Sequence, residues 1–440
     1  YRALQGSGTN TANRSANSTA VGANALKSSS TGFRNTALGA EAGSALTTAC
    51  DTVIIGKSAG AGVMITNSGG SVPSYADGTV AVGYSALTAL TSGERNLAVG
   101  YSAGAATTIG HENTAVGYEA LLTNVHGDGN TAIGNQALRV LAPSDGDGKN
   151  VAVGTDAGKL LTAGNSNVLV GAFSLQSANL TESYNVAIGE QAMASVDEGS
   201  GGDADNNVAI GYRALIGGDF GTASKSLKEN IAIGSNALAG TLTNAQTGTI
   251  AIGHQALTAL TSGAGNVAVG YTAGDEISTG AQNTLIGYGA MHNADDDESN
   301  NTCVGYLAGD DIDGGGTCTI IGSIADAAGA TAANQTRLGY NTQGVADNSV
   351  VLGNDDVTAV YASQDGGAVI SAGGLGIGLA AVAPVTALDV HSAGTEVAAS
   401  FGMADDGTVW ATTRIGETQN EYGAYGFMVG SAAVDGVSSS

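Results

Sequence analysis

The sequence predicts an all-β chain in which short strands stack into a parallel β-solenoid. One motif, plainest from Asn113 to Leu121 (N-T-A-V-G-Y-E-A-L), recurs from end to end. Ten of the 18 intervals between its glycines are 17 residues long. A fixed short period indicates coils that bury their apolar faces only by stacking on one another. The repeat glycines are Gly22, Gly39, Gly56, Gly83, Gly100, Gly117, Gly134, Gly154, Gly171, Gly189, Gly211, Gly234, Gly253, Gly270, Gly287, Gly305, Gly322, Gly339 and Gly353.

A strand is expected in the three residues before each repeat glycine. The residue directly before the glycine is Val, Ile or Leu in all 19 copies, and the one two places earlier is nearly always Val, Ile or Thr. This β-branched alternation is typical of a strand. The residue between them is usually Ala, so the other strand face is apolar but small. We expect that alanine face to pack against a second surface, most simply another chain.

Three further positions complete the motif. Asn stands four places before the glycine in 12 copies, where it either caps its own turn or bonds to the Asn of the next coil. The glycine permits a positive φ or a close backbone approach. Three places after it comes Ala in 16 copies, followed by Leu, Met or Gly. Length varies only between this second contact and the next Asn, so insertions are expected as loops on one edge.

The repeat units resemble a known family. N-T-A-V-G-Y-E-A-L and N-V-A-I-G-E-Q-A-M are similar to the head repeat of trimeric autotransporter adhesins, and more similar still to its longer-period relatives in phage tail fibres. The resemblance covers about Thr19 to Asn354. It implies a left-handed parallel β-roll rod and an intertwined homotrimer, and it implies no shared ligand site.

The repeat and the resemblance together divide the chain into four parts. We expect a lead-in segment (1–18), a shaft of about 19 coils (19–354), a β transition segment (355–390) and a small C-terminal β module (391–440). Asn348 to Val390 resembles the segment that links a tail-fibre shaft to an endosialidase-type intramolecular chaperone. The chaperone would then either be removed after trimer assembly or follow beyond Ser440.

Composition narrows the classes of function. The net charge of −25, from 39 acidic and 14 basic residues, disfavours nucleic acid and anionic lipid as partners. No apolar run approaches 18 residues, so membrane insertion is not expected. Cys50, Cys303 and Cys318 form no C-x-x-C pair, and no nucleophile elbow is present. We therefore expect a protein that is not an enzyme and requires no cofactor.

Two candidate binding sites remain. Asp295, Asp296, Asp297 and Glu298 are adjacent carboxylates that would repel one another unless a cation such as calcium neutralised them. The alternative is a solvated acidic loop. Trp410, Tyr422, Tyr425 and Phe427 form an aromatic cluster that could hold a sugar ring, or else form the core of the terminal module.

Eight of the 14 tyrosines directly follow a repeat glycine, which predicts tyrosine rows along one edge of the coils. These rows either cover the coil edge or present rings to sugars.

The sequence favours a non-enzymatic phage tail fibre, located on the virion tail outside the cell. Its expected partners are two further copies of itself, other tail or fibre proteins, and a polysaccharide or protein on the host surface. Recognition is expected in residues 391–440 rather than in the loop from Val63 to Ala76. One alternative is a bacterial trimeric adhesin on the cell surface. The other is a polysaccharide depolymerase tailspike, which would require paired carboxylates in a cleft.

Overall fold

The computed structural model describes residues 17–62, 76–143, 148–178, 181–196, 203–218, 226–240, 245–294 and 297–357. Within these residues the secondary structure is entirely β-strand and turn, and no helix occurs. The expected lead-in segment up to Ala16, most of the transition segment and the whole C-terminal module lie outside them. The all-β prediction is confirmed for the described part of the chain.

Nineteen strands of three residues each form one parallel sheet. Every strand ends directly before a repeat glycine, as the motif predicts. The strands are β1 (Thr19–Val21), β2 (Thr36–Leu38), β3 (Val53–Ile55), β4 (Val80–Val82), β5 (Leu97–Val99), β6 (Thr114–Val116), β7 (Thr131–Ile133), β8 (Val151–Val153), β9 (Val168–Val170), β10 (Val186–Ile188), β11 (Val208–Ile210), β13 (Ile231–Ile233), β15 (Ile250–Ile252), β16 (Val267–Val269), β17 (Thr284–Ile286), β18 (Thr302–Val304), β19 (Thr319–Ile321), β20 (Thr336–Leu338) and β21 (Val350–Leu352).

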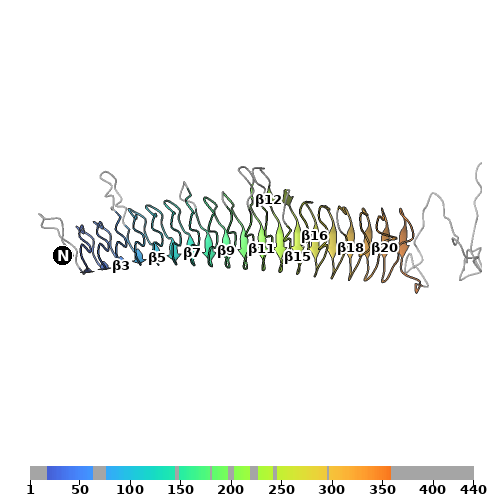
Figure 1. The fold of residues 1–440 in the computed structure, drawn as a ribbon, viewed down its shortest axis with the longest axis horizontal. Coiled ribbons are helices and arrows are strands. Elements are labelled where there is room, and N and C mark those ends of the chain that lie inside the picture. Colours follow the sequence, from blue (N-terminus) through green and yellow to red (C-terminus); the bar gives the residue numbers. More distant parts are fainter. Residues whose placement is uncertain are drawn as a thin grey trace, which may run out of the picture. The chain divides into compact units, whose positions relative to one another are not determined.

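Each strand pairs with the strands of the coils before and after it, always in the repeat register. The central residues of β5, β6 and β7 are thus partners in a line, Ala98 with Ala115 and Ala115 with Ala132. Figure 1 shows the strands side by side along one edge of the coils. At about 4.8 Å between strands, the 19 strands span roughly 90 Å.

The connections that vary in length lie away from this sheet. β12 (Leu227–Lys228) and β14 (Gln246–Thr247) pair in parallel as a second, two-stranded sheet within two of the longer connections. In Figure 1, β12 lies on the side of the coils opposite the main sheet. The prediction that insertions emerge at one edge is confirmed for these described connections.

The small central residue of each strand points into the solenoid. Seventeen of the 19 central residues are buried, and only Ala20 and Val351 in the two end strands are partly exposed. The expectation that the alanine face packs against another chain was therefore wrong. The alanines pack inside their own chain, and the larger residues that replace them in some strands, such as Leu169 and Leu285, are buried there as well. The β-branched residues on either side point outwards instead.

The repeat glycines stack in a column in which no side chain fits. Gly117 has a φ of 142°, and a Cβ added to it would lie 2.2 Å from the carbonyl oxygen of Gly134 in the next coil. Gly270 and Gly287 repeat this geometry with 2.0 Å. Any side chain would overlap the backbone of the next coil, so both functions predicted for the glycine are confirmed.

The asparagines form a ladder inside the coils, which resolves the two alternatives in favour of the bond between coils. Asn130 donates its backbone N–H and its Nδ2 to Asn113 Oδ1, and its own Oδ1 accepts the same two bonds from Asn150. These buried amides keep adjacent coils in register. Unbroken from coil to coil, this asparagine ladder comprises Asn96, Asn113, Asn130, Asn150, Asn167, Asn185, Asn207 and Asn230.

The position four places after the repeat glycine holds Leu, Met or Gly in most coils. Its backbone is in the left-handed conformation in each case. Leu87 and Leu121 have φ values of 48° and 52° there, and Gly104 has 57°. The left-handed conformation suits Gly without cost, whereas a leucine adopts it only where burial compensates the strain. Both leucines are almost fully buried.

Large and small residues compensate one another in the core. Where Gly158 replaces the leucine, Leu169 stands in the strand centre usually held by Ala, and its Cδ1 lies 2.7 Å from where a Gly158 Cβ would be. Gly274 and Leu285 repeat the arrangement with 2.5 Å. The coils therefore keep a nearly constant core volume although individual positions vary.

One coil near the end of the described shaft places an arginine in the alanine position. Arg337 is fully buried, and its Nη2 donates to Gln335 Oε1 over 2.6 Å. Gln335 Nε2 donates in turn to Asp347 Oδ1 over 2.9 Å, so an amide connects the two charges. Desolvation lowers the pKa of the guanidinium.

Candidate interaction surfaces

The outward residues of the main sheet form one apolar surface. We call the residues one and three places before each repeat glycine the outer sheet face. They are Val, Ile, Leu or Thr in every strand, so this face has no charged side chain along the described shaft. Its most exposed members are Val21, Leu38, Val53, Ile133, Val168, Val170, Ile188, Ile286, Ile321, Leu338, Val350 and Leu352. The position directly before the glycine is Val, Ile or Leu in every strand, so an uncharged row of apolar side chains follows the whole sheet and is a candidate interaction surface.

Tyrosines stack in rows next to the outer sheet face. Tyr84, Tyr101 and Tyr118 have ring centroids 5.2 and 5.3 Å apart, with their planes 14° from parallel. A second row stacks His254, Tyr271, Tyr288 and Tyr306 at 5.0 to 5.4 Å. The predicted rows are confirmed. Ring faces within a row cover one another, and the six tyrosines of the two rows nevertheless remain exposed.

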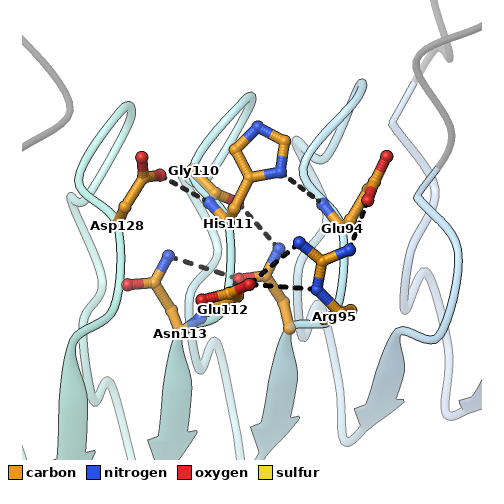
Figure 2. Close-up of polar contacts among 8 residues, drawn as sticks. Glu94, Arg95, Gly110, His111, Glu112, Asn113 and Asp128 are labelled. Carbon is orange, nitrogen blue, oxygen red and sulfur yellow. Dashed lines mark hydrogen bonds and ion pairs between the residues drawn. The ribbon is translucent and has the colours of Figure 1, made fainter.

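Polar side chains link the connections on the other edge of the coils. Figure 2 shows His111 Nδ1 accepting the backbone N–H of Glu94 over 3.2 Å, while Asp128 Oδ1 accepts the backbone N–H of His111 over 2.7 Å. Arg95 forms ion pairs with Glu94 and Glu112 at 2.6 and 2.9 Å. Each contact joins consecutive coils or neighbouring residues. This edge therefore holds the connections together, and these contacts give His111 no hydroxyl or thiol partner to activate.

The predicted acidic site is described only in part. Asp295 and Asp296 lie outside the described residues. Asp297 is exposed, whereas Glu298 is buried and its Oε1 accepts the backbone N–H of Gly314 over 2.6 Å. Glu298 therefore supports the next coil. Across the described part of the chain, no group of three or more His, Cys, Asp or Glu side chains has the geometry to hold a metal ion.

The aromatic candidates Trp410, Tyr422, Tyr425 and Phe427 lie outside the described residues, as does most of the loop from Val63 to Ala76. In the described part of the chain no helix is long and apolar enough to cross a membrane. Comparison with protein-family models and with curated protein sequences finds no match.

The sequence reasoning missed two features. The alanines were expected to meet another chain, whereas the outer sheet face is formed by the residues on either side of them. The signal was that these flanking positions carry no charged residue in any strand. The contact between Asp275 and His292, 2.5 Å from Oδ1 to Nδ1, was not anticipated. Its signal was the spacing of 17 residues, which places both side chains at the same position of consecutive coils.

Proposed function

We propose that residues 19–354 form the shaft of a homotrimeric attachment fibre, most similar in kind to a phage tail fibre, and that the outer sheet face joins its chains. The observation that carries this proposal is the apolar outer sheet face. It runs along all 19 strands while the rest of the chain is strongly acidic.

The area of this face is in the range that stable association needs. With about 3.3 Å per residue and about 4.8 Å per strand, three residues across 19 strands cover roughly 900 Å². A standard protein interface buries about 800 Å² on each partner. Leaving such a face in water would forgo the free energy that its burial provides, at roughly 25 cal/mol per Å².

A second and a third copy of the chain are the best-matched occupants. The outer sheet face repeats its side chains once per coil, and only a surface with the same period can fit it over its whole length. The distribution of charge also supports association of identical chains through this face. Three chains carry 3 × −25 = −75, and an interface without charged residues keeps that repulsion outside the contact. The left-handed winding and the intertwined trimer belong to the same proposal.

Self-association can be tested with charges placed on the outer sheet face. Sedimentation velocity of the full chain should give a trimer, whereas the triple variant Ile133→Glu, Val170→Glu, Ile188→Glu should dissociate. Ile109→Glu is the matched control, because Ile109 is a similarly exposed isoleucine in a connection. A monomeric wild-type chain would contradict the proposal, and so would a triple variant that stays trimeric.

Attachment is the second part of the proposal. A shaft of near-identical coils offers a partner little to distinguish, so we assign recognition of a host surface glycan or protein to residues 391–440. The shaft acts as a spacer that joins other tail or fibre proteins. Loops on a rigid scaffold often carry binding, but the longer loops of this chain are scattered along the coils.

The attachment test uses immobilised bacterial surface polysaccharides and whole bacterial cells. Deleting residues 391–440 should abolish binding and leave the trimer intact, whereas shortening the Val63 to Ala76 loop should not. Adding EDTA tests whether calcium contributes. Full binding by the truncated chain would place recognition in the loops. New reducing ends in incubated polysaccharide would favour a depolymerase.

A further inference from the structure

The final third of the shaft has an unusual charge composition. From Ile231 to Thr336 the sequence contains no Lys and no Arg, but it holds ten carboxylates. His254 and His292 are the only side chains in this range that can become positive. A proton is therefore the only internal source of positive charge for these coils.

Three titratable side chains stand in line on consecutive coils. Asp275, His292 and Asp310 each lie five places after a repeat glycine, and strands β16 to β18 pair in register beside them. Asp275 Oδ1 lies 2.5 Å from His292 Nδ1. Asp275 is nearly buried, whereas His292 keeps a part of its ring in solvent. The imidazole can thus exchange protons while it touches a carboxylate held inside the coil.

The next two carboxylates are largely buried, and one of their oxygens has no hydrogen bond. Asp310 Oδ1 is buried without a hydrogen-bond partner, although its Oδ2 accepts Asn293 Nδ2 over 3.0 Å. Asp326, on the following coil, is almost buried and accepts the backbone N–H groups of Asp311 and Ala327. An ionised carboxylate oxygen without a donor is costly to bury.

We propose that Asp275, His292, Asp310 and Asp326 form a proton-binding column that makes the coils from β16 to β19 tighten as the pH falls below neutral. Protonating His292 places a positive charge between Asp275 and Asp310. Protonating Asp310 or Asp326 removes a negative charge from a poorly solvated place. Each protonation reduces an unfavourable electrostatic free energy that is present in the folded coils and absent from the unfolded chain.

The surroundings raise the pKa of all four residues of the column. The hydrogen bond to Asp275 raises the pKa of His292, and the charges of Asp310 and Glu276 add to this effect. Burial raises the pKa of Asp275 and of Asp310. Asp311 and Asp310 reinforce the effect of burial on Asp326, whose pKa rises to about 6.

The folded coils therefore hold more protons than the unfolded chain. The contribution of His292 is complete below its unfolded pKa of about 6.5 and is lost as the pH rises through the higher folded value. The carboxylates cost nothing below their unfolded pKa of about 4, and they destabilise fully once the pH exceeds their raised folded values. Both effects predict greater stability at pH 5.5 than at pH 7.5.

Hydrogen exchange of the assembled full chain, read by mass spectrometry and corrected for intrinsic rates, tests the proposal. Peptides from Val267 to Ile321 should exchange more slowly at pH 5.5 than at pH 7.5, by about tenfold for each unit of pKa difference. Peptides from Leu97 to Ile133 serve as the internal reference and should show little change. Equal protection of the Val267 to Ile321 peptides at the two pH values would overturn the proposal.

Two variants separate the column from a general effect of charge. His292→Gln should reduce the pH difference, and Asp310→Asn should raise protection at pH 7.5, because it removes a partly buried negative charge. His111→Gln is the control, since that imidazole accepts a backbone N–H and has no carboxylate against its ring in the structure. If both column variants kept the full wild-type pH difference, the column would not be its cause.

Discussion

Asn113 Oδ1 accepts two hydrogen bonds from Asn130 in the next coil, at 3.0 Å from the backbone nitrogen and 3.1 Å from Nδ2. The Nδ2 of Asn113 donates in addition to the carbonyl oxygen of Gly127 across its own coil, over 2.8 Å. One buried amide therefore satisfies backbone groups both within a coil and between coils. Few other side chains offer an acceptor and a donor at this length.

Asn130→Asp should destabilise the shaft. The substitution removes the Nδ2 donor and places a buried carboxylate oxygen against Asn113 Oδ1, so we expect a loss of at least about 1–3 kcal/mol in the free energy of unfolding. Urea denaturation followed by circular dichroism measures it. Asn135→Asp is the control, because Asn135 is exposed, and it should change stability by less than about 0.5 kcal/mol. Equal effects would mean that the ladder does not stabilise the coils.

Gly117→Ala should be among the most damaging single substitutions. Its Cβ would overlap the carbonyl oxygen of Gly134, and the backbone conformation is itself strained for alanine by about 1–3 kcal/mol. We expect a lower melting temperature and faster proteolysis at neighbouring coils. Gly248→Asn tests positive φ alone, since φ is 66° and nothing lies within 4 Å of the added Cβ. That variant should remain close to the wild type.

Leu169→Ala should leave a cavity. Leu169 is fully buried and fills the space beside Gly158, so we expect a loss of about 2–5 kcal/mol. Leu160→Ala removes the same atoms from a side chain that is 42% exposed and should cost far less. Thermal denaturation of the two variants side by side gives the comparison. A similar cost at both positions would show that the coils collapse to fill the gap.

The thiols should differ in reactivity. Cys303 and Cys318 are fully buried, and burial raises the pKa of both, so neither should form a thiolate accessible to reagents. Cys50 is partly exposed. An aromatic disulfide reagent at pH 8 should modify one thiol per folded chain and three in urea. Rapid modification of more than one thiol in the folded chain would contradict the packing around Cys303 and Cys318.

The architecture could be predicted because the same motif recurs many times along the chain. Nineteen copies of one motif fix the strand positions, the glycine column and the edge that carries the insertions. The asparagine ladder could also be foreseen as one of two alternatives. A single coil would have supported none of these statements, since a strand of three residues is too short to recognise alone.

The direction of the side chains could not be read from hydrophobicity, because both faces of the strand are apolar. Size decides it. The narrow coil favours a small residue such as Ala115 in most strand centres, and a larger one fits where the core beside it is small, as for Leu169 beside Gly158, so Val116 and its equivalents point outwards. The contact between Asp275 and His292 escaped prediction for another reason, since the five scattered histidines share no motif and only the stacking of coils brings one of them to a carboxylate.

The register of the glycine column has a consequence for how such a shaft changes length. Each coil contacts only its two neighbours, and Gly117 contacts Gly134 in the same way that Gly270 contacts Gly287. A whole coil can therefore be removed or duplicated without altering the joint, whereas a partial one would break both the column and the asparagine ladder. The length of the solenoid can therefore change only in whole coils, by about 4.8 Å for each coil.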